Sequence, residues 1–106
     1  MTRSRVTTHV LDAVAGRPAV GVTARLEGAD GSLIAAGTTD DDGRIGGLGP
    51  VDLEPGSYRI TFATGAYFAA TFYPEVVLSF TIDDPDAHYH VPLLLSPYAY
   101  STYRGS

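Results

Sequence analysis

The 106-residue sequence predicts an all-β fold, a sandwich of two sheets, on three observations. Its 12 glycines and 7 prolines separate short segments rich in Val, Ile, Thr, Tyr and Phe. Several of these segments alternate apolar with polar residues, which is the period of two that a half-buried strand requires. Only one segment has the character of a helix, and it is short. We therefore expect about eight strands in two packed sheets, with one short helix.

The expected strands follow one another along the chain, with a turn signal between most neighbours. They cover residues 6–12, 20–27, 33–38, 57–63, 75–82, 89–95 and 98–104. The Asp-Gly dipeptide at 30–31 predicts a tight hairpin, because it accommodates the positive φ angles of such turns. The acidic segment 39–44 predicts a second turn, which ends in Arg44. The short helix is expected within residues 65–72, since Pro74 must end it soon afterwards.

Alternation assigns the two faces of the first strand and of the last long strand. Val10 lies on the more apolar face of the first strand, which turns His9 to the opposite face. In the last long strand the odd-numbered residues are the more apolar ones, and His90 faces away from them. The residues expected between the sheets are Val10, Leu26, Ile60, Phe62, Val77, Val91 and Leu93. Pro92 lacks a backbone N–H, so we expect it at a sheet edge or at a bulge.

The composition excludes several classes of function. Cysteine is absent, which excludes disulfides, thiolate nucleophiles and Cys-ligated metal centres. Lysine is also absent, which excludes Schiff-base catalysis and a P-loop. A net charge of -5 without a basic cluster argues against a nucleic-acid partner. No apolar segment is long enough to cross a bilayer or to act as a leader, so we expect a cytoplasmic protein without a membrane partner.

Polar residues on the outward faces are the candidates for chemistry. His9 and His90 can exchange protons near neutral pH, although each by itself is compatible with an ordinary surface histidine. His88 and His90 could bind zinc with His9, but three histidines on strands distant in sequence need not converge, and we expect no metal. Arg44 either balances its acidic neighbours or presents a guanidinium to a carbonyl or an oxyanion. Residues 103–106 are either a frayed end or a docked one.

Five motifs in a fixed order carry a family resemblance over nearly the whole chain. They are Thr8-His-Val-Leu-Asp12 followed by Gly16-Arg-Pro-Ala19, then Thr39 to Arg44 ending in Asp-Gly-Arg, Phe72-Tyr-Pro-Glu-Val76, Tyr89-His-Val-Pro-Leu-Leu-Leu-Ser-Pro97, and Ser101-Thr-Tyr-Arg-Gly-Ser106. Together they resemble the transthyretin-related proteins of the 5-hydroxyisourate hydrolase group. The terminal Tyr-Arg-Gly-Ser is the most specific motif, because it resembles the signature that separates these hydrolases from hormone-carrying transthyretins.

The resemblance implies a single transthyretin-like 5-hydroxyisourate hydrolase domain over residues 1–106, with the transthyretin-like two-sheet sandwich as its fold. It also implies a homotetramer, a dimer of dimers, whose active sites lie in clefts between dimers. The catalytic residues that it implies are His9, Arg44, His90 and Ser106. The substrate-binding residues that it implies are His9, Arg44, Tyr103 and Ser106. His88 matches no catalytic position of the family.

The implied reaction opens the ring of 5-hydroxyisourate to give 2-oxo-4-hydroxy-4-carboxy-5-ureidoimidazoline, in urate degradation, without a cofactor. Either His9 or His90 would act as general base on water, and the other would orient water or substrate or protonate the leaving nitrogen. Arg44 would stabilise the oxyanion, and Ser106 would hold a histidine or the substrate through its hydroxyl or its carboxylate. Two alternatives are a transthyretin-like carrier of a small aromatic ligand and an adhesive β-sandwich. A carrier has no need for the paired histidines, the Asp-Gly-Arg turn and the Tyr-Arg-Gly-Ser end together, and an adhesive domain predicts secretion signals.

Overall fold

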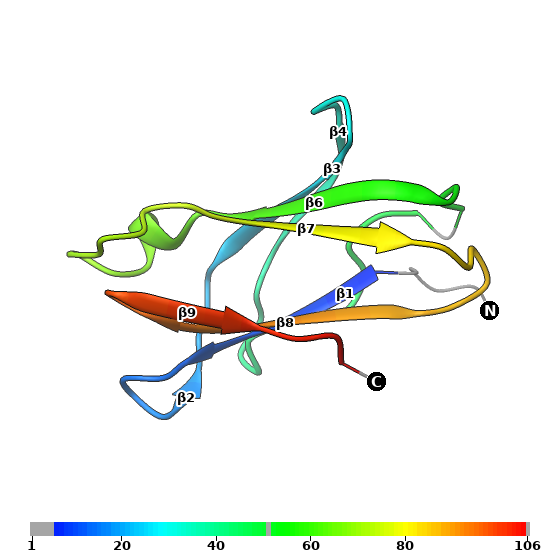
Figure 1. Cartoon of the computed structure of the whole chain (residues 1–106). Helices are drawn as coiled ribbons and strands as arrows, with labels where there is room; N and C mark the ends of the chain where they lie inside the picture. The colour runs from blue at the N-terminus through cyan, green and yellow to red at the C-terminus, as the bar shows by residue number, and fades with distance from the viewer. Residues whose placement is uncertain (1–5, 51, 106) are drawn as a thin grey trace.

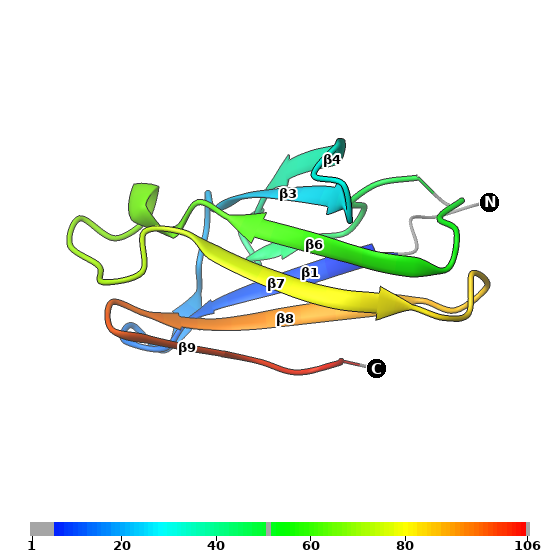
Figure 2. The ribbon, with the colours of Figure 1, turned by 45° about the horizontal axis from the view of Figure 1, so that its top comes forward.

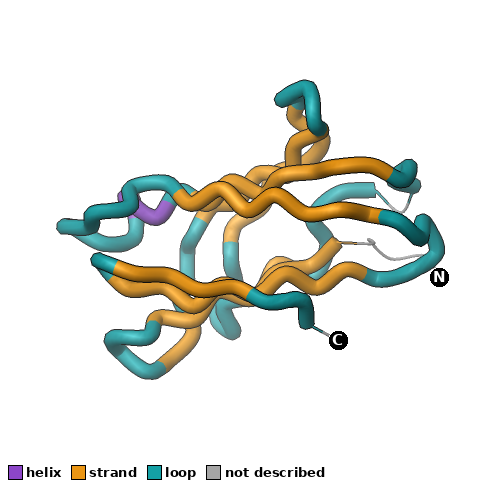
Figure 3. The backbone as a smooth tube through the Cα atoms, viewed as in Figure 1, coloured by secondary structure: helices purple, strands orange, loops and turns teal. Residues whose placement is uncertain are grey.

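The computed structural model describes residues 6–50 and 52–105, which form two sheets that face each other (Figures 1 and 3). The larger sheet contains β1 (Val6–Asp12), β2 (Arg17–Pro18), β5 (Arg44–Ile45), β8 (Tyr89–Ser96) and β9 (Ala99–Thr102). The smaller sheet contains β3 (Thr23–Gly28), β4 (Leu33–Thr38), β6 (Gly56–Phe62) and β7 (Val76–Ile82). A single-turn 3-10 helix, η1 (Thr64–Ala66), precedes β7. The predicted all-β sandwich of two sheets is confirmed.

The larger sheet is organised around the parallel pair β1 and β8. Its strand order is β2-β1-β8-β9, and β5 also pairs with β1. The smaller sheet has the order β4-β3-β6-β7 and is antiparallel throughout. In Figure 1 the strands β3, β6 and β7 lie above β1, β8 and β9, and Figure 2 shows β9 running along β8 at the edge of this second layer. This arrangement places β1 and β9, the first and the last strands of the chain, in the same sheet.

The core between the sheets contains most of the residues that alternation predicted. Val10, Leu26, Ile60, Phe62 and Leu93 are fully buried. Val91 is half-buried and packs against this cluster.

The prediction for Val77 is wrong, because that side chain is 43% exposed. Its neighbours Val76 and Leu78 point inward in its place. The alternation of this strand itself favours the even-numbered set, because Val76, Leu78, Phe80 and Ile82 are all apolar, whereas Val77 shares its face with the polar residues Ser79 and Thr81.

The segment before β7 is less helical than the sequence predicts. The helix expected within residues 65–72 is reduced to η1, because backbone groups of this segment bond to distant parts of the chain. Gly65 N–H donates to the carbonyl of Pro74, and Phe72 N–H donates to the carbonyl of Pro97. The Phe72 hydrogen bond takes the place of a bond within a longer helix, and the Gly65 bond ties the first turn of the segment to the residues before β7.

The two-residue strand β5 begins at the end of the turn that the sequence predicts over residues 39–44, and it pairs with β1, as does the other two-residue strand, β2. Gly43 explains the position of β5, because its φ of 74° lies in the left-handed region and a Cβ atom there would meet the carbonyl oxygen of Val10. Val10 N–H donates to the carbonyl of Gly43 at 2.7 Å. The Asp-Gly turn therefore lies directly against β1, and the next residue, Arg44, pairs with that strand.

Pro92 lies in a strand with a neighbour on each side, and not at a sheet edge as expected. The β8–β9 ladder accommodates it by stopping at the pair Leu93 and Thr102. The Thr102 hydroxyl donates to the carbonyl of Pro92 at 2.6 Å, and pairing resumes with the bridge between His90 and Gly105. The interruption falls where proline has no N–H to donate.

The described part of the chain contains no helix that is long and apolar enough to span a membrane.

Candidate active site

The registers of β1 with its two neighbours gather the candidate residues on the outer face of the larger sheet. In the parallel pair with β8, Thr7 is opposite His90, and in the antiparallel pair with β5, His9 is opposite Arg44. Thr7 and His9 are two residues apart on one strand and therefore share a face. A cleft of about 520 Å³ opens on this face. Its lining residues are Thr7, Thr8, His9, Arg44, Ile45, Gly46, His88, His90 and Tyr103. The volume is within the range of small-molecule sites.

The acidic turn holds Arg44 at the edge of the cleft. One carboxylate oxygen of Asp40 accepts the backbone N–H groups of Asp42 and Arg44, each at 2.9 Å. The hydrogen bond from Arg44 N–H is the main reason that the pKa of Asp40 lies below its ordinary value. The Arg44 side chain is exposed. The turn therefore fixes the backbone of Arg44 and leaves its guanidinium to the cleft.

His90 is the candidate base whose surroundings differ most from water. Its ring is half-buried, and Nδ1 lies 2.8 Å from Oγ1 of Thr7. Burial lowers the pKa of His90 below the ordinary value for histidine, because the charged ring loses water. The positive charge of Arg44 lowers the pKa further, followed by His9 and His88. A neutral imidazole is thereby favoured, and this is the form that can accept a proton.

The C-terminal segment is docked against His90 as far as the structure describes it. Gly105 N–H donates to the carbonyl of His90 at 2.9 Å. A Cβ atom at position 105 would lie 2.5 Å from Cδ2 of His90, so a residue larger than glycine would collide with the imidazole. The glycine of the terminal Tyr-Arg-Gly-Ser motif thus allows the chain to pass directly over the ring.

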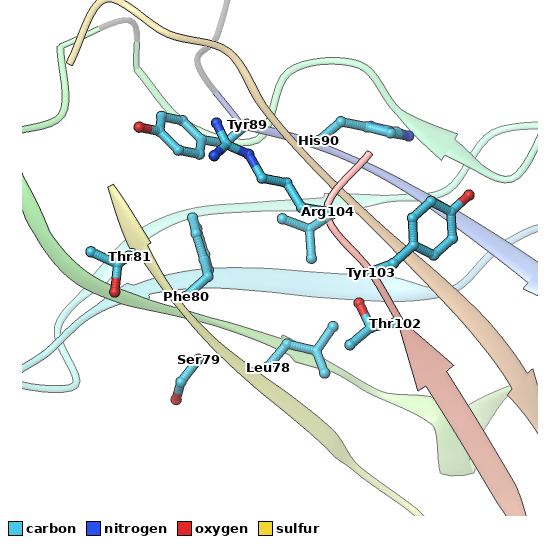
Figure 4. A pocket seen from close by; sticks show the side chains of 10 residues that line it. Leu78, Ser79, Phe80, Thr81, Tyr89, His90, Thr102, Tyr103 and Arg104 are labelled. Atoms are coloured by element: carbon cyan, nitrogen blue, oxygen red, sulfur yellow. The ribbon is translucent and has the colours of Figure 1, made fainter. Parts of the chain in front are cut away.

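Arg104 anchors the same segment on the opposite side. Its guanidinium carbon lies 4.7 Å from the centre of the Tyr89 ring, in a cation–π contact. The Tyr89 hydroxyl donates to Asp83 at 2.8 Å and accepts the backbone N–H of Asp84 at 3.0 Å, which ties the ring to the preceding turn. Figure 4 shows Arg104 reaching over Tyr89, while the side chains of Tyr103 and His90 extend to the other side. Successive residues of the terminal motif therefore face opposite sides.

A second cavity, of about 290 Å³, lies between β7 and this anchored segment (Figure 4). Its walls are mainly apolar, with Leu78, Phe80 and Val91 among them, and Arg104 contributes its only permanent charge. His90 and Tyr103 border both cavities. The three histidines and Arg44 meet only in the outer cleft, which is therefore the candidate active site.

The outer cleft brings together most of the residues that the resemblance implied. His9, Arg44, His90 and Tyr103 all line it. Their roles stay a prediction. The fourth implied catalytic residue, Ser106, lies outside the described residues.

Two further polar residues line the cleft, namely Thr7, which the sequence did not single out, and His88, which it suggested only as a zinc ligand. His88 Nε2 lies 3.0 Å from Oγ1 of Thr7, the same atom that contacts His90. Alternation in the first strand places Thr7 on the outward face together with His9, and the sequence also shows His88 and His90 as a His-x-His pair. The signal that was lacking is the parallel register of β1 with β8, which local sequence patterns do not encode.

The sequence left open whether the three histidines converge, and all three line the outer cleft. In the described ranges, however, no group of three histidine or acidic side chains is arranged to hold a metal ion. The contacts explain part of this result. Nε2 of His88 and Nδ1 of His90 both face the Thr7 hydroxyl, so these two nitrogens are engaged by a protein oxygen.

Comparisons with a family model and with individual proteins point to the same family. The model of the HIUase/Transthyretin family, in which HIUase denotes 5-hydroxyisourate hydrolase, matches residues 6–105. A 5-hydroxyisourate hydrolase of Caulobacter vibrioides is 45% identical to this chain over 97% of the chain and 99% of the relative. One from Salmonella typhimurium is 48% identical over 92% of the chain and 78% of the relative.

Solved structures give the same result for the fold. The 5-hydroxyisourate hydrolase of Klebsiella pneumoniae superposes with a TM-score of 0.88 at 38% identity, covering 95% of this chain and 98% of that one. The transthyretin of Sparus aurata superposes with a TM-score of 0.86 at 33% identity, covering 97% of both chains. The fold is thus shared by hydrolases and transthyretins, and the chain belongs to the HIUase/Transthyretin family.

Proposed function

We propose that this protein is a hydrolase that opens the ring of 5-hydroxyisourate to give 2-oxo-4-hydroxy-4-carboxy-5-ureidoimidazoline, a step of urate degradation. The observation that carries the proposal is the meeting of His9, Arg44 and His90 in one cleft of a chain that is 45% identical to a 5-hydroxyisourate hydrolase over nearly its whole length. Hydrolysis of a cyclic amide needs a base for water, a cation for the oxyanion and an acid for the leaving nitrogen. These three side chains supply one group for each need.

The proposed mechanism assigns the base to His90. Its lowered pKa keeps the imidazole neutral, so the ring can take a proton from water as the water oxygen attacks the carbonyl carbon. Arg44 binds the carbonyl oxygen and stabilises the negative charge that develops there. The carbon–nitrogen bond then breaks, and His9, opposite Arg44 in the sheet, delivers a proton to the departing nitrogen. No cofactor takes part in these steps.

The terminal segment completes the proposed site. Tyr103 lines the cleft, and we assign it a role in substrate binding. Ser106 follows directly after Gly105, whose N–H donates to the backbone of His90. From the resemblance we assign Ser106 the role of holding a histidine or the substrate through its hydroxyl or its carboxylate, and the docking of its chain neighbour Gly105 on His90 supports this assignment.

We further propose that the protein is a homotetramer, a dimer of dimers. The support comes from two sheet edges, since β9 ends the larger sheet and β7 ends the smaller one. All four residues of β9 are exposed, and Tyr98 and Tyr100 present large aromatic surfaces at 76% and 40% exposure. Exposed strand edges with aromatic side chains are suited to pairing with another copy.

The remaining expectations stay predictions. They are that residues 1–106 form a single domain, that the protein is cytoplasmic, and that neither nucleic acid nor a membrane is a partner.

The proposed function is tested by incubating the purified chain with freshly generated 5-hydroxyisourate. The control is a buffer blank, because this substrate also decays spontaneously. We expect the ultraviolet signal of the substrate to disappear much faster with protein than without it, and the ring-opened product to accumulate. Decay at the blank rate, with the ligand retained unchanged on the protein, would support the alternative of a transthyretin-like carrier of a small aromatic ligand.

A further inference from the structure

One hydroxyl group lies between two imidazole rings at the wall of the cleft. Oγ1 of Thr7 is 2.8 Å from Nδ1 of His90 and 3.0 Å from Nε2 of His88. The parallel register places Thr7 opposite His90, and all three side chains are half-buried. Neither Thr7 nor His88 has a part in the mechanism above.

The chemistry of a hydroxyl restricts how these two contacts can form. A hydroxyl has one proton to donate and two lone pairs, whereas a neutral imidazole carries a proton on only one of its nitrogens. Thr7 can therefore donate to only one of the two rings. If both contacts are hydrogen bonds, at least one of the facing nitrogens carries a proton. The tautomers of the two histidines are thus linked through Thr7.

We infer that Thr7 is a positioning residue that donates to Nε2 of His88, accepts from the protonated Nδ1 of His90, and so leaves the lone pair of His90 Nε2 to the cleft. The inference rests on the proposed function, in which His90 must offer a lone pair to water. The reverse direction would put the proton on Nε2 and would make His90 a donor there.

The electrostatics of the cleft favour the same direction. The charged and titratable groups that act on His90 are Arg44, His9 and His88, and Arg44 carries a permanent positive charge. A cation that lines the cleft attracts a lone pair directed into that space and repels an N–H dipole there. The resulting arrangement gives His88 a role without contact to the substrate, because His88 accepts the hydroxyl proton that would otherwise turn to His90.

Three variants separate this role from a merely structural one. Thr7→Val keeps the shape and the strand preference of the side chain but removes the hydroxyl, and Thr7→Ser keeps the hydroxyl. His88→Phe keeps a ring but removes the acceptor, so that the Thr7 proton can turn to Nδ1 of His90. The readouts are the ¹⁵N chemical shifts of the His90 ring, which report the tautomer, and the separate values of kcat and KM for 5-hydroxyisourate.

We expect the protonated-Nδ1 form of His90 in the parent chain and in Thr7→Ser. Thr7→Val should show a mixture of tautomers, and His88→Phe should shift His90 toward protonated Nε2. For Thr7→Val we expect kcat to fall about tenfold to a hundredfold with KM little changed, because a misplaced catalytic group loses rate on that scale. Thr7→Ser should retain most of the parent kcat.

Failure of this inference can be told apart from failure of the proposed function. If the parent chain does not hydrolyse 5-hydroxyisourate, the proposed function is wrong, and the ¹⁵N shifts alone decide whether Thr7 and His88 set the tautomer of His90. If the parent is active and Thr7→Val has the parent tautomer and the parent kcat, the positioning role is wrong. Thermal unfolding of each variant checks that the sandwich is retained.

Discussion

The outer cleft and the cavity beside β7 share a wall but differ in chemistry. His90 and Tyr103 border both spaces. In the cavity beside β7 the polar groups are engaged with one another, since Arg104 lies over Tyr89 and the Tyr89 hydroxyl bonds to a turn. In the outer cleft the guanidinium of Arg44 is exposed beside half-buried imidazoles. From this difference we propose that one side of the C-terminal segment serves as an anchor and that the other side serves catalysis.

The largest expected effect comes from His90, one of the two residues that border both spaces. Replacing His90 by Ala removes the proposed base, so kcat for 5-hydroxyisourate should fall about a hundredfold to ten-thousandfold. The measurement is the steady-state rate of substrate decay, corrected for the blank. A rate equal to that of the parent chain would remove His90 from the mechanism and would weaken the distinction between the two sides.

A smaller effect is expected where the terminal segment crosses the imidazole. Gly105→Ala places a methyl group 2.5 Å from Cδ2 of His90, so either the ring or the terminal segment must move. We expect kcat to fall about tenfold to a hundredfold, as for other displaced catalytic groups. Ser101→Ala, an exposed change in the same segment, is the control and should leave kcat unchanged. If Gly105→Ala keeps the parent kcat, as Ser101→Ala should, docking of the terminal segment does not position His90.

The pH dependence of the reaction tests the electrostatic coupling between Arg44 and His90 in the outer cleft. The pKa of His90 is lowered from 6.5, so the protonated, inactive form should appear only below that pH, and the acid limb of kcat/KM should lie there. Removing the positive charge of Arg44 should raise the pKa of His90, because the imidazolium is then less disfavoured. An NMR titration of His90 in Arg44→Ala checks the sign, with the exposed Arg25→Ala on β3 as control. An unchanged pKa in Arg44→Ala would contradict the coupling.

Local patterns in the sequence were sufficient for much of the fold. The alternation in β1 gave both its bounds and the outward direction of His9, because one face of that strand is buried and the other is not. The prediction for Val77 went against the same rule, since the other odd-numbered residues of β7, Ser79 and Thr81, are polar and the even-numbered ones are all apolar. The expected short helix is present only as the single turn η1, and Phe72 N–H, at the end of the predicted segment, donates instead to the carbonyl of Pro97, which is distant in sequence.

The candidate site was predictable to a smaller extent. Family motifs named His9, Arg44 and His90, but they did not show how these residues meet. Their meeting depends on the parallel pairing of β1 with β8 and on the two-residue strand β5, which are long-range features without a local signature. Thr7 was missed for this reason, since only the register places its hydroxyl between two imidazoles.

The central claim is that the outer cleft, and not the apolar cavity on the other side of the terminal segment, is the active site. The most direct test compares kcat/KM for 5-hydroxyisourate in Arg44→Ala, which changes the cleft, and in Phe80→Leu, which changes the cavity. We predict a loss of about a hundredfold to a thousandfold for Arg44→Ala, the scale of a lost oxyanion contact, and a rate near that of the parent for Phe80→Leu. A large loss in Phe80→Leu together with parent activity in Arg44→Ala would contradict the claim.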